Sequence, residues 1–175
     1  MRHPDGRGEA AGEAFWRFSL ALYARPGVAD ALIALQERAA RDVNLILFGL
    51  WLGVGRGRRL DAAELAIAAA AIAPINAAVV APLRQLRRQL KAAADPDLQA
   101  LRRQIAGLEL AAERRVQQRL AASLPVGKSL EARAMPEAHR LAAAESNLAL
   151  TLGGDARSPE ARALRQALAT LIRLI

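Results

Sequence analysis

The sequence predicts an all-α protein, a compact helical bundle of about seven to eight helices that includes an antiparallel helical hairpin. Apolar residues make up 53% of the 175 residues, yet alanine dominates them and aromatic residues are only 3%. Alanine loses no side-chain entropy in a helix and is therefore the strongest helix former. No stretch shows the alternation of β-branched and polar residues that is typical of strands.

The length fits one domain. Residues 1–12 are rich in glycine and charge, so we expect them to be disordered, with residues 13–175 forming a single helical domain. The expected parts of this domain are an aromatic-rich N-terminal unit (13–73), a basic helical hairpin (75–122) and C-terminal helices (130–175).

The first two predicted helices cover residues 13–24 and 27–40, and the segment Arg25-Pro26-Gly27 separates them. The third is the run RDVNLILFGLWLG at 41–53. Asp42 is placed to cap it, and the glycines at 53, 55 and 57 are placed to end it. Because this run has almost no polar face, we expect it to be the central helix of the bundle.

The hairpin is predicted from two leucine stripes joined by a short link. A fourth helix begins at the capping-box pattern Asp61-x-x-Glu64, and Pro74 ends or kinks it. We interpret the apolar stretch 65–81 as a buried helix rather than a membrane span. The fifth helix then runs to residue 93, and the sixth covers 97–122 after the cap Asp95. A loop is expected at 123–129, followed by helices over 136–152 and from Ser158 to the C-terminus.

Several classes of site are not expected. The chain has no cysteine and two histidines without ligand spacing, so we predict no metal and no cofactor. Motifs for a serine nucleophile, a phosphate loop or a magnesium–diphosphate site are missing. The N-terminus lacks an apolar segment typical of a signal peptide, so we expect a cytoplasmic protein without membrane insertion.

All six aromatic residues fall within 15–51, which marks this region as a core or a pocket. The first interpretation is a hydrophobic core, because aromatic side chains bury large areas. The second is a ligand site in which aromatic walls surround polar contacts. Its candidate residues are Trp16, Tyr23, Gln36, Asp42, Asn44 and Trp51. Asp42 has a sufficient role as a helix cap, whereas Asn44 lies inside a helix where asparagine is unfavourable.

A second candidate site is a basic stripe. The formal net charge is +8, and Arg84, Arg87, Arg88 and Lys91 recur at helical spacing, with Arg102 and Arg103 across the hairpin turn. Such a stripe can bind phosphates or an anionic surface, and it can equally be a solvated helix face. Nearly all basic residues are arginine, a bias expected of a GC-rich genome, so nucleic acid is not favoured as a partner.

Residues 15–53 carry a resemblance to a known family. Trp16-x-Phe18-Ser19 and Tyr23 are followed by Pro26-Gly27-Val28, by Leu35-Gln36, by Asp42-Val43-Asn44-Leu45 and by Trp51. This order and spacing resembles the signature of an uncharacterised proteobacterial family that is classed as a domain of unknown function. The resemblance implies no established activity and no catalytic residue.

The sequence therefore favours a small non-catalytic protein that binds a partner protein or an apolar ligand. One alternative is an enzyme with a pocket around Asp42 and Asn44. Another is binding of an anionic surface or nucleic acid through the 84–103 stripe. The oligomeric state stays open.

Overall fold

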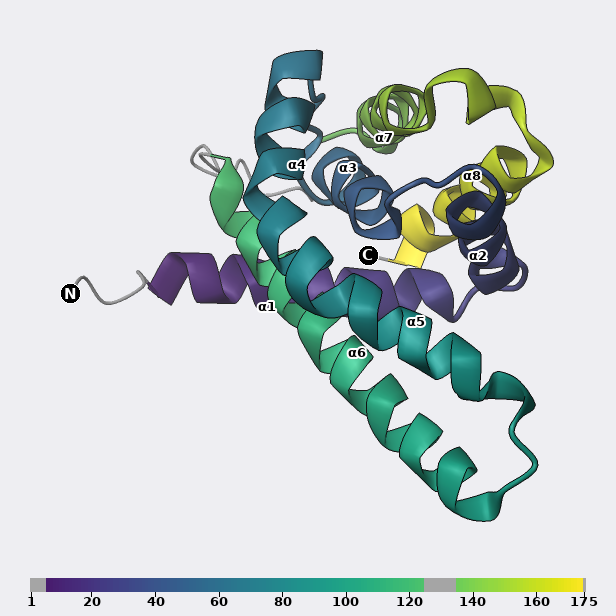
Figure 1. Cartoon of the computed structure of the whole chain (residues 1–175). Coiled ribbons are helices and arrows are strands. Elements are labelled where there is room, and N and C mark those ends of the chain that lie inside the picture. Colours follow the sequence, from purple (N-terminus) through teal and green to yellow (C-terminus); the bar gives the residue numbers. More distant parts are fainter. Residues whose placement is uncertain (1–5, 125–134, 175) are drawn as a thin grey trace.

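The computed structural model describes residues 6–124 and 135–174, and in these residues every regular element is a helix. Figure 1 shows α3 running through the middle of the molecule, while α5 and α6 project together towards the lower right. The elements in chain order are α1 (Gly6–Tyr23), α2 (Val28–Arg38), α3 (Val43–Arg56), α4 (Ala62–Ile75), the π-helical segment η1 (Asn76–Val80), α5 (Ala81–Gln89), the 3-10 segment η2 (Leu90–Ala92), α6 (Pro96–Ser123), α7 (Glu137–Leu152), η4 (Gly153–Arg157), α8 (Pro159–Leu171) and η5 (Ile172–Leu174). The all-α bundle with an antiparallel hairpin is confirmed.

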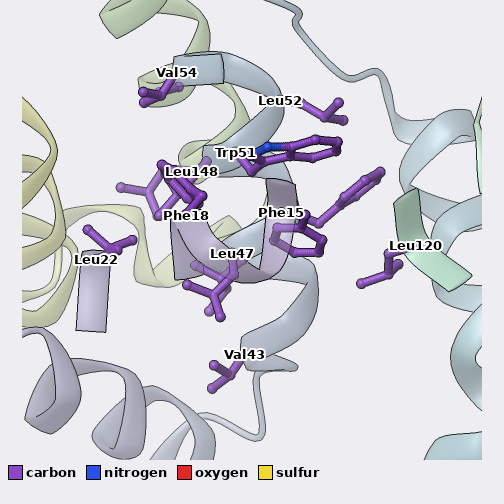
Figure 2. Close-up of a cluster of buried hydrophobic side chains, with 14 of the residues drawn as sticks. Phe15, Phe18, Leu22, Val43, Leu47, Trp51, Leu52, Val54, Leu120 and Leu148 are labelled. Atoms are coloured by element: carbon purple, nitrogen blue, oxygen red, sulfur yellow. The ribbon is translucent and has the colours of Figure 1, made fainter. Parts of the chain in front are cut away.

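The central position of α3 follows from its composition. Every residue from Val43 to Val54 except Leu45 is buried. Figure 2 shows Phe15 of α1 beside Trp51, and their rings stack with centroids 5.1 Å apart. Phe48 completes the aromatic cluster, 5.7 Å from Phe15. The helix is enclosed because an all-round apolar helix is stable only when other elements cover each of its sides.

Two glycines let α3 and α7 cross closely. A Cβ atom on Gly53 would lie 2.3 Å from the Cα of Ala144, and one on Gly49 would lie 3.2 Å from the Cβ of Asn147. The prediction that Gly53 and Gly55 end the helix is wrong, since both lie within it. Gly57 is the C-cap, with a φ of 60° that glycine adopts without strain.

Pro74 does not end α4, contrary to one expectation. The chain stays helical from Ala62 to Ala92 and passes through the π-helical segment η1, which lies between Pro74 and Pro82. Proline cannot donate to the carbonyl one turn earlier, and a π-bulge is one way for a helix to accommodate it. The Ala81 N–H donates to the Asn76 carbonyl in this wider turn.

The same run is mostly exposed, so the expectation of a buried helix at 65–81 is also wrong. It is long and apolar enough to cross a membrane, with a mean hydropathy of 2.0 over its most apolar window, and 17% of that window is buried. Length and composition alone are weak evidence, because helices of other kinds of protein meet the same criteria.

The predicted helix starts are confirmed where a side chain caps them. Asp42, Asp95 and Ser158 each accept a first-turn N–H, and Asp61 and Glu64 form a complete capping box. The N-terminus differs, because α1 begins at Gly6 and residues 6–12 are helical rather than disordered. Most of the predicted loop at 123–129 lies outside the described residues.

Candidate functional site

A polar cavity of about 700 Å³ lies between the α2–α3 junction and the helical run formed by η1 and α5. We call it the polar pocket. Its lining combines side chains that are far apart in the sequence: Gln36, Ala40, Arg41, Asp42, Asn44, Asn76, Val80, Ala81, Arg84, Gln85, Arg88 and Gln89. The volume is within the range of about 300–1,000 Å³ that is typical of small-molecule sites.

Asp42 forms one wall of the polar pocket, and both of its carboxylate oxygens are used. Oδ1 accepts the backbone N–H groups of Asn44 at 2.8 Å and Leu45 at 3.3 Å. Oδ2 accepts the side-chain amide of Asn76 at 2.7 Å. The carboxylate therefore caps α3 and also ties α3 to the π-helical segment. A group committed to three donors is poorly suited to take part in proton transfer.

Asn44 is held by a chain of buried polar side chains. Its Oδ1 accepts the Nε2 of Gln117 at 3.1 Å, and the Oε1 of Gln117 accepts the hydroxyl of Ser19 at 3.1 Å. All three residues are buried. A buried amide costs stability unless it is hydrogen-bonded, so this chain explains how an asparagine is tolerated inside the most apolar helix.

Carboxylates on α6 neutralise much of the basic stripe. The Nε atoms of Arg84 and Arg87 donate to the two oxygens of Glu109, at 2.9 Å and 2.5 Å, and Arg84 also reaches Glu113 at 2.7 Å. Burial raises the pKa of Glu109, but the hydrogen bonds from Arg87 and Arg84 outweigh it, so the pKa lies below its ordinary value. Burial raises the pKa of Glu113 above its ordinary value despite Arg84.

Arg41 and Arg88 line the polar pocket and have N–H groups that make no hydrogen bond to the described residues. Arg41 pairs with Asp155 through Nε and Nη2. Arg88 reaches Glu37 only through Nη2, at 3.3 Å, and its side chain is 48% exposed. The amides of Gln36, Gln85 and Gln89 make no side-chain hydrogen bond to the described residues. These groups offer both donors and acceptors to a molecule in the pocket.

The two predicted sets of site residues meet in this cavity. Gln36, Asp42 and Asn44 come from the predicted ligand set, and Arg84 and Arg88 come from the predicted basic stripe.

The aromatic candidates lie elsewhere. Trp51 is buried in the core, with Arg56 above its ring. Trp16 lies under Arg114, at 5.8 Å from the ring centroid. Tyr23 is partly exposed, and burial of its hydroxyl together with Glu113 raises its pKa to about 12.

The other basic candidates do not line the pocket. Arg87 pairs with Glu109, and Lys91 and Arg103 are exposed. Arg102 is partly buried, and its Nε has no hydrogen-bond partner in the described part of the chain. Among the described residues, no group of three or more acidic or histidine side chains could hold a metal ion.

Sequence reasoning missed Asn76, whose Oδ1 is buried without a partner among the described residues. The available signal was an asparagine between two prolines inside an apolar helix. Arg41, Gln85 and Gln89 carried no such signal.

A comparison with protein families matches residues 14–120 to the family described as "Protein of unknown function (DUF2390)". The chain belongs to this family. The match extends well beyond residues 15–53, and the whole lining of the polar pocket falls within it. Neither the curated proteins nor the solved structures that were compared gave a match. The polar pocket therefore lies within the part of the chain that matches the DUF2390 family.

Proposed function

We propose that this DUF2390 protein is a non-catalytic binding protein that holds a small polar molecule with an acidic group in the polar pocket. The observation that supports this most is the lining itself. Three arginines, three glutamines and two asparagines converge on one cavity, and Asp42 is the only acidic residue among the described residues that line it. Such a lining suits a polar ligand better than the apolar ligand that the sequence suggested.

Arg88 is the residue that we propose for recognition of the acidic group. Its side chain is half exposed and its guanidinium makes one long contact to the described residues, which leaves other N–H groups for a ligand. A guanidinium binds a carboxylate or a phosphate through two parallel hydrogen bonds. The amides of Gln36, Gln85 and Gln89 would then fix the orientation of the remainder of the molecule.

The two alternatives have less support. An enzyme would need Asp42 to exchange protons, but its oxygens hold a helix cap and Asn76. An anionic-surface binder would need a free basic stripe, but Glu109 and Glu113 pair with Arg84 and Arg87. Steeply salt-dependent binding to DNA, RNA or anionic vesicles would favour the second alternative over our proposal.

Native mass spectrometry of gently purified protein tests the proposal. We expect a small acidic molecule to accompany the wild type and to be released on denaturation. Ala81→Trp places an indole in the polar pocket and should abolish retention of this molecule. Ala78 is an exposed alanine of the same helical run that does not line the pocket, so the control variant Ala78→Trp should retain the molecule. A wild type that carries no small molecule, or equal retention in both variants, would contradict the proposal.

A further inference from the structure

The projecting hairpin carries an apolar surface that the other described residues do not cover. Its members are Leu86 of α5 and Leu98, Leu101 and Leu108 of α6, with 42%, 38%, 45% and 59% of their surfaces exposed. We call these four residues the leucine face. Together they expose about as much surface as two fully exposed leucines, which is about the size of the largest apolar patch on a typical monomer, and such a patch is often functional.

These leucines surround a small apolar cluster of their own. Ile105 is 4% exposed, yet it lies outside the main core cluster. No residue of α5 is buried. The outer part of the hairpin is therefore a two-helix layer, closed around Ile105 and open on the side of the leucines. Two helices alone rarely bury an apolar stripe, whereas four helices do so in a bundle.

The leucine face and the basic stripe lie on different sides of the hairpin. On α5, Leu83, Leu86 and Leu90 share one stripe, and Arg84, Arg87, Arg88 and Lys91 share the adjacent one. The arginines point towards Glu109 and Glu113 on α6, on the side that also borders the polar pocket. The leucines lie on the neighbouring side of the hairpin.

Along each helix, the neighbours of the leucine face carry almost no positive charge. On a helix, the neighbours of a residue lie three and four positions away. Around Leu86, Leu101 and Leu108 these positions hold proline, alanine, glutamine, apolar residues and Asp97, and no lysine or arginine. Around Leu98 the one basic neighbour is Arg102, which is only partly exposed.

This charge pattern indicates which kind of partner the leucine face can bind. A helix face that binds an anionic membrane is flanked by free lysine and arginine, whereas Arg84 and Arg87 on the adjacent stripe of α5 pair with Glu109 and Glu113. An acidic partner would likewise find little to pair with. Two copies of a chain with a net charge of +8 repel each other except where the contact excludes basic residues. The leucine face meets this condition.

From these observations we infer that the leucine face binds the leucine face of a second copy of this chain. Such a contact is isologous, because the same surface serves on both subunits of a two-fold dimer. The two hairpins would form a four-helix bundle with the leucines inside it. The face extends about 15 Å along α6, from Leu98 to Leu108, at about 1.5 Å per residue. This is a small interface, so the dimer should form at micromolar concentrations or above.

Sedimentation velocity over a range of concentrations tests the inference. The wild type should shift from the 18.7 kDa monomer towards twice that mass as its concentration rises. Leu108→Glu should weaken self-association at least about tenfold, because it buries a carboxylate at the contact. Leu110→Glu is the matched control on the opposite side of the same helix, where the leucine is 51% exposed, and it should dimerise as the wild type does.

A wild type that stays monomeric throughout, or equal loss of dimerisation in both glutamate variants, would overturn the inference. Cross-linking gives a second measurement that does not depend on a destabilising change. The chain has no cysteine, so Gln104→Cys, between Leu101 and Leu108, should be joined across the dimer by a short bis-maleimide. Arg103→Cys, on the other side of α6, should not be joined. Equal cross-linking of the two variants would also count against the dimer.

Discussion

Replacing Gly53 by alanine should separate the central helix from α7. The new Cβ would lie 2.3 Å from the Cα and 2.4 Å from the backbone nitrogen of Ala144. Carbon atoms in contact are about 3.5–4.0 Å apart, so one helix must move by roughly 1 Å or more. Both contacts are to backbone, and no side-chain rotation can relieve them.

The magnitude follows from two opposing effects. Overpacking of a dense core costs about 1–3 kcal/mol, and contacts to backbone favour the upper end of that range. Alanine in place of glycine favours the helix by about 0.5–1 kcal/mol. We expect Gly53→Ala to lower the free energy of unfolding by about 2 kcal/mol. That is a large part of the roughly 5–15 kcal/mol that stabilises a typical domain.

Urea denaturation followed by circular dichroism measures this loss. The control is Gly107→Ala in α6, where an added Cβ would meet no atom within 4 Å. With the clash absent, only the helix preference remains, so this variant should be more stable than the wild type by about 0.5–1 kcal/mol. If Gly53→Ala matched the gain of Gly107→Ala, the close crossing of α3 and α7 would be wrong.

Three further variants and one titration test the buried polar groups. Asn147→Leu should lower the free energy of unfolding by about 2–4 kcal/mol in the same assay, because it removes three hydrogen bonds and leaves the buried Leu60 N–H without its acceptor. Glu109 has a lowered pKa, so its contribution to the free energy of unfolding is present above about pH 4.5 and is lost as the pH falls through the lowered value. Glu109→Gln should therefore make the free energy of unfolding depend less on pH in this acidic range, and it should lower that free energy by about 1–3 kcal/mol at pH 7. The pKa of Glu113 is raised, so Glu113→Gln should cost less at pH 7, and equal losses would contradict this difference. Tyr23 is the only tyrosine, and its absorbance should titrate at about pH 12 rather than 10, with a lower value in Glu113→Gln.

The features predicted correctly from the sequence are local ones. The caps at Asp42, Asp61 and Ser158 depend on neighbours within the same turn, which the sequence shows directly. Asn44 was recognised as unusual, but its partner Gln117 is 73 positions away and no spacing rule connects the two. The stripe at Arg84 looked free for the same reason, since Glu109 comes from the other helix of the hairpin.

The errors have a common physical cause. Pro74 and Gly53 are helix breakers by local preference, yet both lie within helices in the structure. The π-helical segment accommodates the proline, and contact with Ala144 requires the glycine. Tertiary packing overrode the local preference in each case. The polar pocket shares this origin, because the π-helical segment brings Asn76 to Asp42.

A crystal structure of protein purified without denaturation tests the proposed function most directly. We predict density for an organic molecule in the polar pocket, with an acidic group within hydrogen-bonding distance of the Arg88 guanidinium. The amides of Gln36, Gln85 or Gln89 should contact the same molecule. A pocket that holds only ordered water, while the purified protein carries its small molecule at another place, would contradict the proposal.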